Sequence, residues 1–80
     1  YIDFYKNSID VINFVRAQTK PYPGSYFYLT DGRKIIIYEI VIDITTNLDM
    51  QIGVIKKVDD SYYVRCKDAN LKIKDYLIVD

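Results

Sequence analysis

Adjacent carboxylates are the first side chains in this 80-residue sequence whose type and spacing suit chemistry. Asp59 and Asp60 are neighbours, and with Asp49 they could bind a cation or act as an acid and a base. Aspartate is also an ordinary residue in the break between two strands, where its side chain bonds to the local backbone. We therefore interpret the pair as turn residues.

The single cysteine, Cys66, is the one residue that could act as a nucleophile through a lowered pKa, because Arg65 and Lys67 flank it. Side chains alternate along a strand, however, so Cys66 should face away from both charges and lie in the core as an inert thiol. One cysteine forms no intrachain disulfide, whereas a secreted domain this small normally needs several. We therefore expect a reducing, cytoplasmic location.

Histidine is missing from the whole sequence, which removes the commonest general base and the commonest zinc ligand. The sequence also holds no glycine-rich phosphate-binding motif, because Gly24, Gly32 and Gly53 are dispersed. These residues therefore predict no catalytic residue, no cofactor site and no metal site.

Aromatic side chains offer a binding hypothesis, since nine tyrosines and three phenylalanines stand in the sequence and exposed rings can stack on nucleotide bases. A small core without tryptophan must also draw its bulk from such residues, and they favour strands. We expect most of them in the core. The tyrosines that we expect on any binding face are Tyr26, Tyr28, Tyr62 and Tyr63.

The charges are balanced, with 11 lysines and arginines against 11 aspartates and glutamates. A nucleic-acid-binding domain usually carries a basic excess, because phosphate contacts supply much of its affinity. A local basic face stays open as an alternative to a mixed surface. Its residues would be Arg33, Lys34, Lys56, Lys57, Arg65, Lys67, Lys72 and Lys74.

The elements that must position these side chains fit one domain, residues 1–80, that begins with a helix. Asn7 or Ser8 can cap its first turn, and prolines 21 and 23 end it near residue 18 or 19. The residues of its expected apolar stripe are Ile9, Ile12 and Val15, with Val11 and Phe14 beside them. No apolar run approaches the ~20 residues of a membrane span.

From residue 25 onward the sequence predicts strands, over 25–30, 33–44, 51–58, 61–67 and 71–79. Asp31-Gly32 suits a type I′ turn that joins the first two strands, because both of its positions need a positive φ. The second strand is apolar on both faces, with Ile36, Ile40 and further residues on one and Ile35, Ile37 and Val41 on the other. Such a strand is buried on both sides, bends or carries a bulge.

One helix followed by five strands with no helix between them excludes a parallel α/β sheet. The expected fold is mainly β: an N-terminal helix and a five-stranded, antiparallel, open Greek-key barrel similar to an OB-fold.

One segment is more specific than packing requires, residues 13–26, in which a helix, Arg16, Lys20, Pro21-Tyr22-Pro23-Gly24 and a strand follow in turn. This segment resembles the start of the C-terminal domain of the formyltransferases that use 10-formyltetrahydrofolate, including methionyl-tRNA formyltransferase and the sugar-nucleotide N-formyltransferases. Residues 2–4, 8–9 and 31–38 are similar to the family's pattern as well. Further along, Ile52 stands before Gly53 where the family usually has proline.

The resemblance implies a two-domain enzyme whose N-terminal domain binds the folate and carries the catalytic residues. That domain is absent from these residues, and because they begin at Tyr1 we expect a piece of a longer protein. By this resemblance the chain is a non-catalytic C-terminal domain, and its partners are the catalytic domain of the same protein and tRNA or a sugar nucleotide. We expect no membrane partner.

The Pro-Tyr-Pro-Gly loop is the candidate site for orienting the missing domain, because two prolines restrict the backbone around Tyr22 and present its ring at low entropic cost. Arg16, Lys20 and Gly24 complete this candidate interface. The alternative is that Tyr22 merely plugs the end of the barrel. Zero net charge favours an amino-sugar substrate slightly over tRNA, and a free-standing OB-like module that binds single-stranded nucleic acid stays open as a different class of function.

Overall fold

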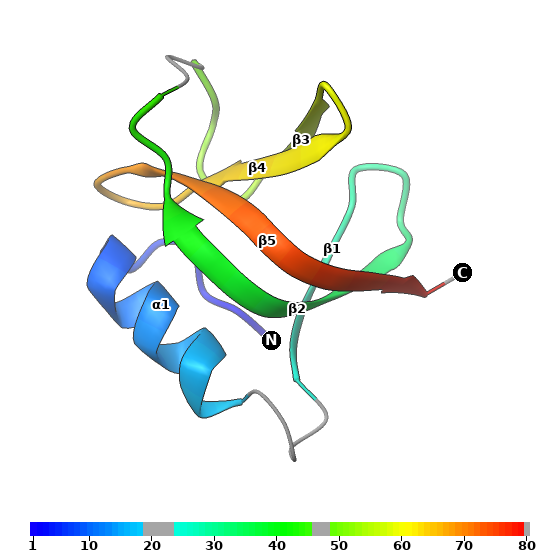
Figure 1. Ribbon diagram of the computed structural model, residues 1–80, viewed down its shortest axis with the longest axis horizontal. Helices are drawn as coiled ribbons and strands as arrows, with labels where there is room; N and C mark the ends of the chain where they lie inside the picture. Colours follow the sequence, from blue (N-terminus) through cyan, green and yellow to red (C-terminus); the bar gives the residue numbers. More distant parts are fainter. Residues whose placement is uncertain (19–23, 46–48, 80) are drawn as a thin grey trace.

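A computed structural model describes residues 1–18, 24–45 and 49–79, and shows one helix followed by five antiparallel strands (Figure 1). The elements are α1 (Ser8–Ala17), β1 (Ser25–Tyr28), β2 (Lys34–Ile42), β3 (Ile55–Val58), β4 (Ser61–Arg65) and β5 (Asn70–Val79). The strands lie in the order β1-β2-β5-β4-β3. Hairpins join β3, β4 and β5, and β2 lies beside β5, which is the Greek-key arrangement. The predicted fold class is confirmed.

The sheet curls where the pairing of β2 with β5 is interrupted. At this place, halfway along both strands, the side chains that face the core shift by one position. Pairing between them is irregular around Glu39 and Asp75, and regular before and after. On β2, Ile35, Ile37 and then Ile40 are buried, so the spacing of the buried residues changes from two to three at this point. The predicted bend is therefore confirmed, whereas the prediction that Ile40 shares a face with Ile36 was wrong.

The β1–β2 connection is not the predicted type I′ turn. Gly32 has a φ of +92°, but Asp31 is not among the residues with positive φ. The Gly32 N–H donates to the Leu29 carbonyl at 3.0 Å and the Leu29 N–H to the Arg33 carbonyl at 2.8 Å, so the loop has three residues. The Asp31 carboxylate accepts from the Arg33 backbone N–H at 3.0 Å and from its Nε at 2.8 Å, which holds the turn.

The two-residue turn with two positive φ values lies instead at Asp59-Asp60, between β3 and β4. Their φ angles are +50° and +67°, and Val58 pairs directly with Ser61. Aspartate adopts this conformation more readily than most residues, because its short polar side chain bonds locally. The prediction that these two carboxylates are turn residues is confirmed.

Helix α1 packs against β2 through a narrower stripe than predicted. Val11 and Val15 are buried and Ser8 is buried with them, while Ile9 is 65% exposed and Phe14 39% exposed. The expected stripe placed Ile9 inward, and this was wrong because Ser8 takes the inward position at the start of the helix. The helix ends at Ala17 with Gln18 as its C-cap, as predicted.

The core fills the space between α1, the concave side of the sheet and the N-terminal segment. Its fully buried side chains come from every one of these parts: Ile2, Phe4, Val11, Val15, Ile35, Ile37, Val64, Cys66 and Leu71. The third predicted strand is shorter than expected, since Gly53 at a φ of +82° turns the backbone before β3. In the described part of the chain, no helix is long and apolar enough to cross a membrane.

Candidate functional site

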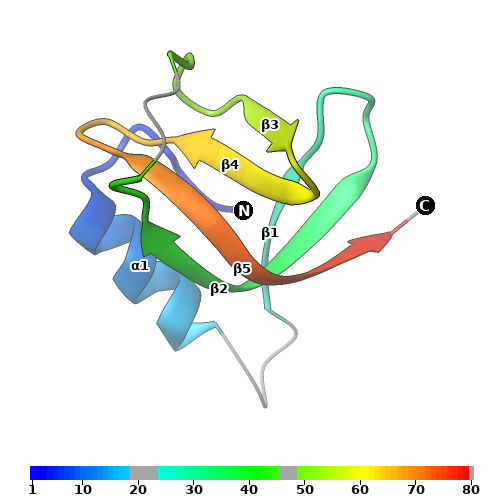
Figure 2. The same cartoon turned by 45° about the horizontal axis from the view of Figure 1, so that its top comes forward.

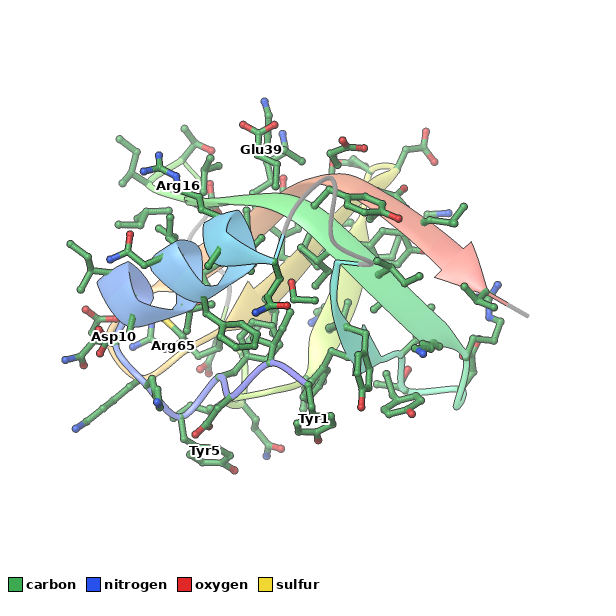
Figure 3. All side chains as sticks on the ribbon, turned by 90° about the horizontal axis from the view of Figure 1, so that it is seen from below. Tyr1, Tyr5, Asp10, Arg16, Glu39 and Arg65 are labelled. Atoms are coloured by element: carbon green, nitrogen blue, oxygen red, sulfur yellow. The ribbon has the colours of Figure 1, made fainter. Side chains whose placement is uncertain are left out.

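Arg16 and Gly24 flank the predicted interface loop: Arg16 lies in the last turn of α1 (Figure 3), and Gly24 directly precedes β1. Arg16 is exposed in the last helical turn, where its positive charge complements the helix dipole. The other four candidates, Lys20, Pro21, Tyr22 and Pro23, lie outside the described residues. The structure therefore locates the two ends of the candidate site.

Gly24 occupies a position where only glycine fits. Its φ is +93°, and a Cβ there would lie 2.7 Å from Ile36 Cγ2 and 2.9 Å from Tyr38 Cε1. The next residue, Ser25, is buried and donates its hydroxyl to the Ile37 carbonyl at 3.0 Å. The loop between α1 and β1 therefore ends on a rigid anchor against β2.

The N-terminal segment, residues 1–7, begins beside β1 and turns at residues 4–6 toward α1. The Ile2 N–H donates to the Tyr26 carbonyl at 3.0 Å, and the Phe4 ring meets the Phe27 ring edge-on with centroids 4.8 Å apart. Its side chains alternate, with Ile2 and Phe4 buried and Tyr5 exposed. This alternation is visible in the sequence and could have predicted the segment, which our sequence analysis missed.

An open groove lies between this segment and α1, with a volume of about 780 Å³. Tyr1 and Tyr5 on its rim are 64% and 70% exposed, and Figure 3 shows both rings on the outside of the molecule. Its polar lining carries both signs, from Asp3, Lys6, Asp10 and Lys67. The groove is thus an aromatic-rimmed surface of mixed charge that is shaped by rigid elements on both sides.

The N-terminal segment, the helix, the glycine anchor and the five strands follow one another along residues 1–79. A scan of family models matches residues 1–77 to the formyl transferase, C-terminal domain. The chain belongs to this family. A search of the solved structures finds no match to this chain. The family match covers the curled sheet as well as the N-terminal segments, so the resemblance seen in the sequence extends over nearly the whole chain.

In this formyl transferase C-terminal domain, the loop after β4 closes the start of α1. The Asp68 carboxylate accepts the Ser8 backbone N–H at 2.7 Å and the Ser8 hydroxyl at 3.2 Å, while Asn7 makes no capping bond with its side chain. The Lys67 N–H donates to the Lys6 carbonyl at 3.1 Å. The helix is therefore capped by a carboxylate 60 residues away, which no local sequence pattern could have predicted.

Cys66 lies beneath this cap and is chemically quiet. Its side chain is fully buried, and its Sγ lies 3.3 Å from Asp68 Oδ1 and 3.3 Å from the Ala69 carbonyl. Burial raises the pKa of the Cys66 thiol, so the group stays protonated at neutral pH. The prediction that Cys66 lies in the core is confirmed.

The hydrogen bonds of Asp68 predict how the stability of this domain changes in acid. The Ser8 backbone N–H holds the pKa of the Asp68 carboxyl below its usual value, so its stabilising effect is present above about pH 4 and is lost as the pH falls through the lowered pKa. We expect Asp68→Asn to lower the melting temperature at pH 7, and to flatten the fall in stability below about pH 4. Thermal melts between pH 7 and pH 2.5 measure both effects.

Asp49→Asn is the matched control, because Asp49 is an exposed aspartate outside the cap. This variant should follow the wild-type pH profile. If Asp68→Asn also followed it, the carboxylate would not be the group that links the helix cap to pH.

The four tyrosines that were predicted for a binding face divide into two pairs. Tyr26 is half-buried and Tyr28 is 46% exposed on β1, beside Tyr1, so these rings lie at the surface. Tyr62 and Tyr63 are buried, so their prediction was wrong: Tyr62 packs into the core cluster, and Tyr63 lies on the opposite face of β4. Lys56 and Lys72 lie directly opposite Tyr63 on these strands, and the Tyr62 ring meets Tyr76.

The basic side chains do not gather on one face. Lys56 on β3 and Lys72 on β5 lie on either side of Tyr63 of β4. Lys34 lies instead at the start of β2, with its Nζ 4.4 Å from the centre of the Tyr26 ring. Arg33 is bound to Asp31 in the hairpin turn. Among residues 1–18, 24–45 and 49–79, no three cysteine, aspartate or glutamate side chains converge as a metal site.

Proposed function

We propose that this chain is the non-catalytic C-terminal domain of an enzyme that moves a formyl group from 10-formyltetrahydrofolate to a primary amine. The family match over residues 1–77 is the observation that carries this proposal. The amine belongs to an amino-sugar nucleotide or to methionyl-tRNA. The domain acts by positioning the substrate or the catalytic domain of the same protein.

The chemistry of the described residues supports a positioning role. The sequence has no histidine, and its one thiol is buried and protonated. A folate pocket must enclose most of its ligand. The groove along α1 is open, and its rim carries carboxylates as well as lysines, so it does not fit the folate. We therefore assign the binding of the folate to the catalytic domain and no reaction step to the residues of this chain.

Three features support a surface that orients a second domain. The N-terminal segment is fixed by Ile2 and Phe4, so any chain preceding Tyr1 would enter at a defined place beside the groove. The groove exposes aromatic rings, which contribute large contact areas at low entropic cost. Gly24 fixes one end of the interface loop, and Arg16 extends from the helix at the other end.

A formyl-transfer assay on the full-length parent protein tests the proposal. The assay should detect transfer to an amino-sugar nucleotide or to methionyl-tRNA, with 10-formyltetrahydrofolate as the donor. Activity with one amine identifies the substrate class. A full-length protein that formylates neither class would overturn the proposal.

Tyr22→Ala in the full-length enzyme tests the interface loop. If this ring orients the catalytic domain, we expect kcat/KM to fall roughly tenfold or more, because small misplacements of reacting groups are costly. The melting temperature of the 80-residue domain should stay unchanged. A loss of stability with unchanged kcat/KM would show instead that Tyr22 plugs the barrel end.

A free-standing module for single-stranded nucleic acid is the second candidate. The observation that favours it is the surface pair of half-buried Tyr26 and exposed Tyr28, with the Lys34 Nζ over the Tyr26 ring, which combines a stacking surface with charge. Titration with tRNA and oligonucleotides over a salt series should then show steep salt dependence. No binding at low salt would exclude this candidate.

A further inference from the structure

The sheet has two edge strands, β1 and β3, and both are protected against pairing with another strand. Along β1, the N-terminal segment bonds through the Ile2 N–H to the Tyr26 carbonyl, and the Tyr1 ring packs against the rings of β1. On β3, the exposed residues Lys56 and Lys57 place charge in the middle of the strand. Lysine on an edge strand is a common means of preventing edge-to-edge association.

The C-terminal half of the inner strand β5 is also open on one side, and it carries neither kind of protection. The pairing of β5 with β4 ends at Ile73, whereas its pairing with β2 continues to Val79. Among the described residues, positions 76–79 therefore have a strand on one side only. Figure 2 shows this half of β5 running away from β4 toward the C-terminus. Its residues are consecutive apolar ones, Tyr76, Leu77, Ile78 and Val79.

The register shows which backbone groups face the open side. The Leu29 N–H donates to the Arg33 carbonyl, so Arg33, Ile35 and Ile37 bond toward β1, and the residues between them bond toward β5. Ile36 is opposite Leu77 on β5, and Lys34 is opposite Val79. The N–H and C=O groups of Tyr76 and Ile78 therefore point to the open edge, where four hydrogen-bonding groups are available to another strand.

We propose that β5 pairs antiparallel with β5 of a second copy of this chain, about a twofold axis at Leu77. Tyr76 then exchanges backbone hydrogen bonds with Ile78 of the second copy, and Ile78 with Tyr76 of that copy. Leu77, which is 53% exposed, lies directly opposite its own symmetry mate. This proposal stands independently of the proposed function.

Side-chain chemistry favours a second copy over an unrelated strand. In this register Asp75 lies opposite Val79 and Leu77 opposite Leu77, so no like charges meet between the described residues 75–79 of the two copies. A twofold contact uses the same patch of both chains, so the apolar residues of β5 supply both halves of the interface. Strand pairing alone buries less area than a standard interface, so the dimer is weak and depends on concentration.

Sedimentation equilibrium of the 80-residue chain over a concentration series tests the proposal. The wild type should shift from monomer toward dimer mass as concentration rises. Leu77→Lys places two lysines directly opposite each other and should weaken the dimer roughly tenfold or more. Ile42→Lys is the matched control, because Ile42 is 47% exposed in a strand but lies at the other end of the β2–β5 pairing. This control should associate like the wild type.

Mixing variants separates loss of pairing from loss of folding. Leu77→Lys and Leu77→Asp should each be monomeric and folded by circular dichroism, and a mixture of the two should restore the dimer mass. A wild type that stays monomeric at the highest concentration would overturn the proposal. So would a dimer that Leu77→Lys leaves unchanged, or one that an added apolar peptide replaces without a preference for the β5 sequence.

Discussion

Phe4→Ala should cost about 3–5 kcal/mol of folding free energy, which is the usual range when a buried aromatic ring is removed from a core. Phe4 is 1% exposed and meets the Phe27 ring edge-on, so the truncation leaves a cavity between the N-terminal segment and β1. Since domains of this size are stable by only about 5–15 kcal/mol, the variant should lose much of its stability. Urea denaturation followed by circular dichroism measures the change.

Tyr5→Ala is the control for Phe4→Ala, because Tyr5 is the next residue in the sequence and its side chain is 70% exposed. Its cost should stay within about 0.5 kcal/mol, as for most surface substitutions. Equal costs for the two variants would contradict the view that residues 1–7 belong to the core. In the full-length enzyme, Phe4→Ala should also disturb the groove, because the same segment forms its wall.

Gly24→Ala should have the second large effect, through two physical causes. An alanine at a φ of +93° is strained, which costs about 1–3 kcal/mol. Its Cβ would also lie 2.7 Å from Ile36 Cγ2, and overpacking of this kind costs typically about 1–3 kcal/mol more. We therefore expect a loss of about 2–6 kcal/mol in chemical denaturation.

Gly32→Ala separates the two causes. Gly32 has nearly the same φ, +92°, but no atom lies within 4 Å of the position that its Cβ would take. This variant should show the backbone strain alone, so the difference between the two glycine variants measures the contact with Ile36 and Tyr38. Equal losses would mean that these two side chains move aside without cost.

The order of elements could be predicted from the sequence because local patterns carry it. The proline pair predicted where the helix ends, and the alternation of apolar and polar residues predicted the five strands. The turn types were assigned to the wrong hairpin: Asp31-Gly32 carries the usual signal but forms a three-residue loop, and Asp59-Asp60 forms the tight turn. Loop length depends on how the flanking strands pair, and the dipeptide alone does not fix it.

Burial was harder to predict than secondary structure because it depends on neighbours far along the chain. Tyr62 packs into the core cluster, while Tyr63 lies on the opposite face of β4 with Lys56 and Lys72 of the neighbouring strands directly opposite it. Ile9 is exposed although its spacing suited the helix stripe. In each case the sequence showed which residues were apolar, and the tertiary arrangement decided which of them met the core.

The candidate site was predicted at its two ends only. Arg16 and Gly24 lie where the sequence pattern put them, at the end of α1 and the start of β1. The groove beside α1 was missed because its walls come from the N-terminal segment, the helix and Lys67, and no single stretch of sequence unites them. Only the alternation of Ile2 and Phe4 with exposed neighbours pointed toward it.

The cap that Asp68 places on Ser8 has a consequence for the order in which this protein folds. The two residues are 60 positions apart, and the Lys67–Lys6 bond beside them spans the chain equally far. A contact between distant residues forms only after the intervening chain has been ordered, because the entropy of closing a long loop opposes it. The hairpin of β4 and β5, by contrast, needs only local pairing. We therefore expect the C-terminal hairpins to gain hydrogen-exchange protection early in refolding, and α1 to gain it last although it precedes the five strands in the sequence.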